Sequence, residues 1–171
     1  MKEQIAASLE QAFSEQGFAE PSVAQLKVAC GVSLRTLYKY FPSKEDMIVA
    51  ALEHRHQRYL NFLLADSPEK GVNAVLHIFN KLKQWMESYA QNGCLSMSAI
   101  AAFPEHAVIN QTVKAHKEEV RRFLGGQSLR DDLAMQLFLL HEGVSNAWPI
   151  MGDETLKSAH ATVLTLLKGE K

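Results

Sequence analysis

The chain has little cysteine, no long apolar run and no excess of charge of either sign. Its 171 residues include two cysteines, Cys30 and Cys94, with no CxxC spacing, so we expect both to be reduced rather than joined. No apolar run approaches the roughly 20 residues of a membrane span, and the first residues, MKEQIAASLEQAF, are amphipathic and charged rather than signal-like. We therefore expect a soluble cytoplasmic protein.

The motifs of several enzyme classes are also missing. The sequence has no Gly-rich phosphate loop, no GxSxG and no HExxH. His54 and His56 are two residues apart and point to different faces of a helix, so they cannot share a metal ion. We expect no enzyme, no cofactor and no metal site. With 18 Lys and Arg against 19 Asp and Glu, any electrostatic recognition must be local.

A strand signal is lacking as well, while apolar residues recur every three or four positions. This spacing predicts an all-α protein of about nine helices, and 47% hydrophobic residues are enough for a sizeable core. Ser22 can begin a short helix that Gly31 ends. A second helix is expected at 34–40, capped by Ser33 and stopped by Pro42.

Two serine–aspartate pairs predict capping boxes at the starts of later helices. Ser43 with Asp46 is the first pair and Ser128 with Asp131 is the second. The glycines at Gly125 and the next position are expected to end a helix just before the second box. Residues 94–103, CLSMSAIAAF, are apolar or small on all sides, which predicts a buried helix.

Basic residues gather in 30–47, CGVSLRTLYKYFPSKEDM. Arg35, Lys39 and Lys44 surround two tyrosines there, and no acid occurs in 21–44. Three short helices before a long one suggest a helix-turn-helix, in which the middle helix would cross the DNA backbone and the last short helix, 34–40, would lie in the major groove. The alternative is an ordinary solvated basic helix.

The chemistry of the 34–40 helix suits that role. Leu37 and Phe41 are four apart and can anchor the helix to the core, while Arg35 can donate two hydrogen bonds to guanine. Lys44, at a helix start, suits a phosphate. Leu34 either contacts a thymine methyl or extends the anchor, and the anchor is favoured. The predicted DNA-contacting residues are Lys27, Ser33, Leu34, Arg35, Thr36, Tyr38, Lys39, Tyr40 and Lys44.

The stretches AFSEQGFAEPSVAQL and CGVSLRTLYKYFPSKEDM resemble the tetracycline-repressor (TetR) family of bacterial transcriptional regulators. The resemblance covers about the first third of the chain. Lys27 departs from it, because a small residue is usual there. It implies a helix-turn-helix DNA-binding domain at 1–46 and a helical effector-binding and dimerisation domain at 47–171. A homodimer would then bind a palindromic operator in double-stranded DNA and repress until an unknown small molecule releases it.

The C-terminal part carries weaker signals. An apolar excess between residues 133 and 167, including Val163 and Leu164, is expected to form the dimer surface, the alternative being a thick internal core. Polar or aromatic residues on apolar stripes are the effector-site candidates, although each one alone suits a core position. They are Trp85, Met97, His116, His141 and Trp148. A different class of function is a helical small-molecule carrier or enzyme whose basic helix is incidental.

Overall fold

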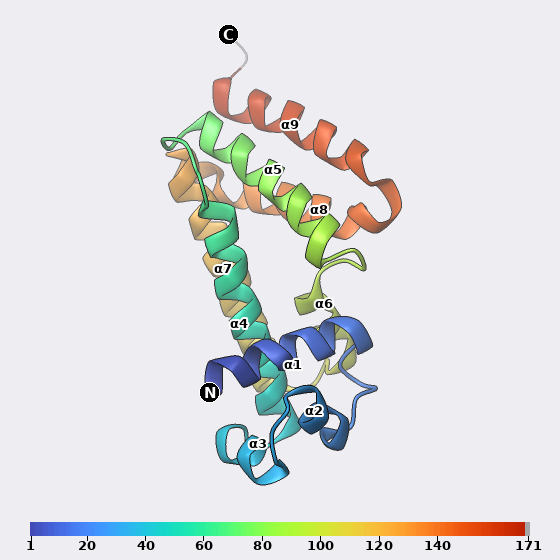
Figure 1. The fold of residues 1–171 in the computed structure, drawn as a ribbon. Helices are drawn as coiled ribbons and strands as arrows, with labels where there is room; N and C mark the ends of the chain where they lie inside the picture. Colours follow the sequence, from blue (N-terminus) through green and yellow to red (C-terminus); the bar gives the residue numbers. More distant parts are fainter. Residues whose placement is uncertain (170–171) are drawn as a thin grey trace. The chain divides into compact units, whose positions relative to one another are not determined.

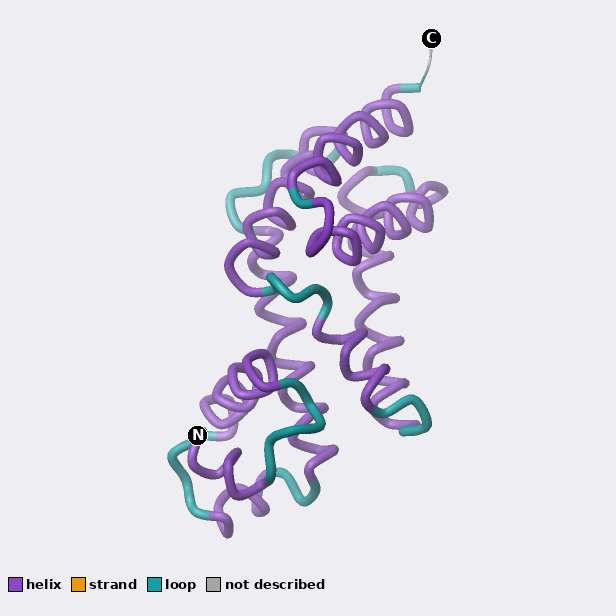
Figure 2. Tube along the Cα trace, turned by 90° about the vertical axis from the view of Figure 1, so that its right-hand side faces the viewer, coloured by secondary structure: helices purple, strands orange, loops and turns teal. Residues whose placement is uncertain are grey.

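The computed structural model describes residues 1–169, and every regular element in that range is a helix (Figures 1 and 2). The all-α prediction is confirmed, with nine α-helices and one 3₁₀ turn, η1, in the described range. The bounds are α1 Lys2–Gln16, α2 Val23–Ala29, α3 Leu34–Tyr40, α4 Lys44–Leu64, α5 Val72–Tyr89, α6 Leu95–Ala102, α7 Ala107–Ser128, η1 Asp131–Leu133, α8 Ala134–Met151 and α9 Asp153–Lys168.

The helices form two compact units. Unit 1 contains Met1–Arg58 and Leu95–Ala115, and unit 2 contains Tyr59–Cys94 and the chain from His116 onward. The boundary predicted after residue 46 falls inside α4, so unit 1 is larger than the predicted DNA-binding domain. The functional division at that residue stays a prediction.

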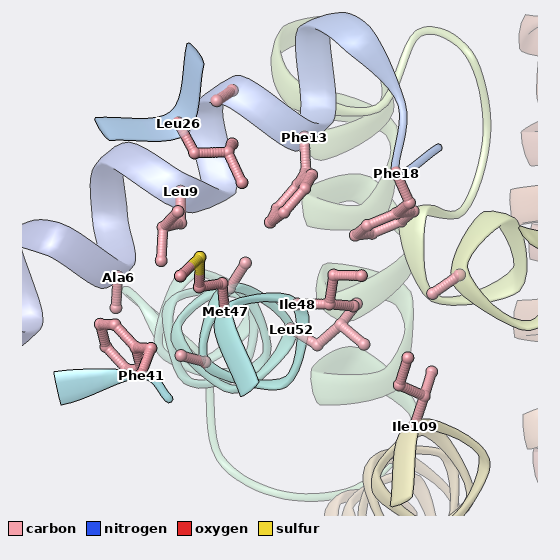
Figure 3. Close-up of a cluster of buried hydrophobic side chains, with 14 of the residues drawn as sticks. Ala6, Leu9, Phe13, Phe18, Leu26, Phe41, Met47, Ile48, Leu52 and Ile109 are labelled. Atoms are coloured by element: carbon pink, nitrogen blue, oxygen red, sulfur yellow. The ribbon is translucent and has the colours of Figure 1, made fainter. Parts of the chain in front are cut away.

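Unit 1 is organised around apolar residues from its first four helices. Leu9 and Phe13 of α1, Leu26 of α2, Leu37 of α3 and Ile48 of α4 are all completely buried. Figure 3 shows the α1 side chains facing those at the start of α4, with the α2 leucine beside them. Each short helix contributes few apolar residues, so its position depends on this shared core.

Local hydrogen bonds begin two helices of unit 1, α3 and α4. Ser33 Oγ accepts from the backbone N–H of Thr36 at 3.0 Å. Ser43 Oγ accepts from the N–H of Asp46 at 3.0 Å, and the Asp46 carboxylate accepts from the N–H of Ser43 at 3.0 Å. The predicted Ser33 cap and first capping box are confirmed. Gly31, with φ of 63°, makes the turn between α2 and α3.

Unit 2 is a bundle in which α5, α8 and α9 lie side by side (Figure 1). Its core includes Val75 and Phe79 of α5, Leu137 of α8 and Val163 of α9, each completely buried. The placement of Val163 at a dimer seam is therefore wrong, because its side chain is used inside the unit. Leu164, the next residue, is only half-buried.

The helix end predicted at Gly125 and the second capping box are wrong. Helix α7 continues to Ser128, whose Oγ donates to the Gly125 carbonyl at 2.8 Å instead of capping a following helix. Asp131 begins η1, and α8 starts at Ala134. A Cβ built on Gly125 would lie 2.9 Å from the Ala134 Cβ, so this glycine permits a close approach between α7 and α8.

The helix predicted within 94–103 is present as α6, but it is not buried on all sides. Leu95 and Ala99 face the core of unit 1, whereas Met97 is 43% exposed. The sequence CLSMSAIAAF is apolar around the whole helix, so the pattern could not identify which side faces the core.

Candidate nucleic-acid interface

Helix α3 has one buried side and one exposed side. Leu37 is fully buried and Phe41, just after the helix, is 3% exposed, so both act as the predicted anchors. Arg35 and Tyr38 are exposed on the other side. Leu34 is 42% exposed, so the favoured prediction that it extends the anchor is wrong.

Three lysines belong to the same segment as this exposed side, and each has a different environment. Lys39 is exposed, with its ammonium 5.8 Å from the centre of the Tyr40 ring, within the range of a cation–π contact. Lys44 Nζ donates to the backbone carbonyl of Ala19 at 3.1 Å. Lys27 on α2 is half-buried. With no Asp or Glu from residue 21 to 44, the local field of this segment is positive.

Two of the predicted contact residues also serve the helix start. The hydroxyl oxygens of Ser33 and Thr36 lie 2.9 Å apart, in addition to the cap described above. Ser33 therefore shapes the entry into α3, whether or not it reaches a ligand. A hydroxyl has one proton and two lone pairs, so Thr36 retains hydrogen-bonding capacity for a further partner.

A buried carboxylate joins α1 to α4 within unit 1. Glu10 is 4% exposed, and its oxygens lie 2.7 Å from His54 Nδ1, 3.1 Å from Arg55 and 2.5 Å from Arg58. Burial alone would raise the pKa of Glu10, but hydrogen bonds from Arg58 and His54 and the charges of Arg58 and Arg55 lower it. Glu10 is therefore ionised and joins α1 to α4.

The sequence patterns did not predict this cluster around Glu10. Glu10 lies 44, 45 and 48 positions before its three partners, and a Glu in an amphipathic helix looks like a solvated residue. A helical projection of α1 would have found it, because Glu10 lies beside Leu9 and Phe13 on the buried side.

The five effector-site candidates fall in different surroundings. Met97 belongs to unit 1, and the other four belong to unit 2. Trp85 is 4% exposed and packs against Tyr59 at 4.9 Å and Tyr89 at 4.9 Å between ring centres. Trp148 and His116 are half-buried. The role of these residues in binding an effector stays a prediction.

His141 is the most deeply placed polar group among those candidates. It is 3% exposed, and its Nε2 lies 2.5 Å from the Tyr59 hydroxyl while its Nδ1 lies 3.1 Å from Glu142. Burial lowers the pKa of His141, against the opposing effect of Glu142, so the imidazole is neutral. A carboxylate can only accept, which places the ring proton on Nδ1 and makes the Tyr59 hydroxyl donate to Nε2.

Residues 5–51, from α1 through α3 to the start of α4, match the family model of the bacterial regulatory proteins of the tetR family. The N-terminal part of the chain is therefore similar to the TetR family. The residues that carry the match include α2, the turn at Gly31 and α3, which are the elements that form the exposed basic surface described above.

Two curated relatives are similar to this chain over part of its length. The HTH-type transcriptional regulator LuxR of Vibrio harveyi is 26% identical over 91 residues, which is 53% of this chain and 44% of LuxR. The nucleoid occlusion factor SlmA of Haemophilus ducreyi is 36% identical over 62 residues, which is 36% of this chain and 31% of SlmA. The matched part thus spans less than half the length of either relative.

Solved structures match nearly the whole chain in fold. A TetR-family transcriptional regulator from Streptomyces coelicolor superposes with a TM-score of 0.82 at 19% identity, covering 98% of this chain and 90% of that one. The reduced form of NemR from E. coli gives 0.74 at 23% identity, covering 95% and 94%. Among residues 1–169, no helix is both long and apolar enough to cross a membrane.

Proposed function

We propose that this chain is a sequence-specific DNA-binding transcriptional regulator of the TetR family that inserts α3 into the major groove. The observation that carries the proposal is the division of α3 into a buried anchor, Leu37, and an exposed side with Arg35, Tyr38 and Lys39. An acid-free basic segment lowers the cost of approaching phosphates, and an exposed arginine can recognise a guanine. The regulator is proposed to be a repressor.

The basic residues divide between base and backbone. Arg35 lies on the exposed side of α3, where a guanidinium can donate two hydrogen bonds to guanine. The Lys44 ammonium donates one hydrogen bond to the Ala19 carbonyl, and its other two protons can donate to a phosphate. Lys39 suits a phosphate for the same reason.

Leu34 is exposed rather than buried, so its side chain is available to contact DNA. Its side chain is 42% exposed, beside the residues that face a base edge. An aliphatic side chain in the major groove recognises the C5 methyl of thymine. Leu34 is therefore proposed to favour a thymine in the operator.

Selection of bound sequences from random duplex DNA tests these roles. Arg35→Ala is expected to relax the preference at one position and cost about 1–3 kcal/mol there. Lys44→Ala is expected to weaken all sequences alike and to reduce the salt slope by about one unit. Lys114→Ala, an exposed lysine of α7, is the matched control and should change neither. An enriched pool no different from the input would reject the proposal and favour an incidental basic helix.

The dimer that a palindromic operator requires is proposed to form through α8. Met135, Leu139 and Ile150 are 50%, 61% and 85% exposed, and Gly143 between them is exposed with open space around it. These positions follow a helical period and form one stripe on α8. A two-fold axis would place each stripe against its copy, with half-sites about 34–36 Å apart.

Light scattering at micromolar concentration tests this surface. Leu139→Asp is expected to give monomers with a full helical signal, because its aspartate would be buried twice per dimer. Leu129→Asp is the matched control, since Leu129 is 68% exposed but lies outside α8. A Leu139→Asp protein that remains a dimer would rule out this stripe.

Release by a small-molecule effector in unit 2 completes the proposal. Trp85 and His141 supply an aromatic ring and a buried polar group of the kind that ligand sites use. A compound that binds there should raise the melting temperature by mass action and weaken DNA binding. His141→Ala should remove both responses. A broad screen with neither response would indicate regulation without such a ligand.

A further inference from the structure

The first turn of α1 places a lysine beside the end of α3. The Lys2 ammonium lies 5.7 Å from the centre of the Phe41 ring, within the range of a cation–π contact. Ala6, one helical turn after Lys2, faces the same ring (Figure 3). Phe41 directly follows α3 and is 3% exposed, so it belongs to the core that α1 and α3 share. Lys2 therefore lies next to the end of α3 in the folded chain, although the two are far apart in the sequence.

In the part of the chain that the structure describes, the Lys2 side chain is exposed and has no carboxylate oxygen within 4.0 Å of its ammonium. By contrast, Lys83 and Lys117 of unit 2 each lie 2.6 Å from a carboxylate oxygen. A cation in the first turn of a helix is also mildly unfavourable, because that end of the helix dipole is positive. Neither an ion pair within residues 1–169 nor the stability of α1 therefore accounts for this charge.

Lys2 and the two lysines proposed to contact phosphates come from three different helices. Lys39 lies in the last turn of α3, and Lys44 begins α4 three residues after Phe41. The N-terminal residues of a recognition helix contact base edges, so its C-terminal end lies nearer a strand that borders the major groove. A lysine beside that end can reach a phosphate of this strand.

We propose that Lys2 contacts a DNA phosphate, a role that rests on the proposed DNA-binding function. The first turn of α1 is then a third element of the DNA-binding surface, besides α3 and the start of α4. The Phe41 ring holds the ammonium near its position before DNA binds, which lowers the entropy lost when the contact forms. Phosphates are the same in every sequence, so the contact fixes the orientation of α3 on the duplex without adding a base preference.

Salt-dependent binding of the full-length protein to its selected operator tests this contact. Lys2→Met keeps the length of the side chain and removes its charge. It should weaken all sequences alike and reduce the slope of log affinity against log salt by about one unit per protomer. Lys2→Arg should restore the slope, because the charge returns. Glu3→Gln and Lys114→Met are matched controls at exposed positions, and both should keep the wild-type slope although each changes the net charge by one.

A neutral methylphosphonate in place of one operator phosphate at a time locates the contact. At the phosphate that Lys2 contacts, the substitution should weaken the wild type but leave Lys2→Met unchanged, because both changes remove the same interaction. At the phosphate that Lys44 contacts, it should weaken both proteins. Independent losses in Lys2→Met at every phosphate would overturn the proposal.

The outcomes separate the Lys2 contact from the function on which it rests. A wild type that selects an operator while Lys2→Met keeps the full salt slope would overturn the contact and leave the DNA-binding proposal standing. If that variant also melts at a lower temperature, Lys2 only joins α1 to α3. A wild type that enriches no sequence would reject both proposals.

Discussion

Two helix starts in unit 1 are set by side chains within three residues of the start, whereas the course of α7 in unit 2 is set by a contact between helices. Ser33 and Ser43 begin α3 and α4 through hydrogen bonds to the backbone three residues ahead. In unit 2, α7 passes through Gly125 because that glycine lets it approach Ala134. A capping side chain stabilises a helix start locally, whereas a helix in a bundle can also end where its packing against a neighbouring helix ends.

The two units also differ in how they hold a buried carboxylate. Glu10 in unit 1 receives two guanidinium groups and an imidazole. Glu142 in unit 2 receives one ammonium and a neutral imidazole from the adjacent His141. Both carboxylates join two helices, α1 to α4 in unit 1 and α7 to α8 in unit 2, but Glu10 does so with more cationic partners. The following changes test that contrast.

The largest effect is expected from a charge in the core of unit 2. Val163→Asp would bury a carboxylate at a site with 0% exposure among apolar residues, at a cost of about 4 kcal/mol or more. Leu164→Asp, one residue later and half-buried, should cost much less. Denaturant unfolding followed by circular dichroism measures both. Equal losses would mean that α9 is not fixed by its buried side.

In unit 1 the matching change is Glu10→Gln, expected to cost about 3 kcal/mol because it leaves buried cations without their anion. The folded pKa of Glu10 is below the ordinary 4.5, so its ionised form stabilises the fold above pH 4.5. That stabilisation is lost as the pH falls further. Thermal melts from pH 7 downward should show the wild type losing stability below pH 4.5 and the variant losing less.

In unit 2 the ionised form of Glu142 stabilises the fold in the same way, because its folded pKa is lowered from 4.5 to about 2. That stabilisation is lost as the pH falls from 4.5 to about 2. Glu142→Gln should flatten the remaining acid dependence in that range. If neither substitution changes how stability falls at acid pH, the two carboxylates are not the groups whose ionised form stabilises the fold.

The fold class and the elements of unit 1 were predictable because their signals are local. Each of these signals acts over four residues or fewer. They are the capping serines, the turn glycine Gly31, and the anchor pair Leu37 and Phe41. Leu34 shows where this fails: its apolar side chain predicted burial, but the short α3 has room for few buried residues and Leu37 takes that place. The Glu10 cluster depends on α1 meeting α4, which no local pattern records.

A smaller effect is expected at the two adjacent glycines of α7. A Cβ on Gly125 would lie 2.9 Å from the Ala134 Cβ and 3.0 Å from an Asp131 oxygen, so Gly125→Ala should cost about 1–3 kcal/mol. Gly126 has nothing within 4 Å, and Gly126→Ala should stabilise α7 by about 0.5–1 kcal/mol. Opposite signs in urea unfolding would confirm the close approach. Stabilisation by both would show that α7 and α8 are farther apart.

The smallest effect separates a capping box from a sequence that only looks like one. Asp46 accepts hydrogen bonds from the Ser43 N–H and from its hydroxyl, so Asp46→Ala should cost about 1 kcal/mol. Asp131 has the same spacing from Ser128, but Ser128 Oγ donates to Gly125 and the backbone there belongs to α7. Asp131→Ala should therefore stay within about 0.5 kcal/mol of the wild type. Both residues are exposed, so burial does not separate them, and equal losses in urea unfolding would mean that the second box forms after all.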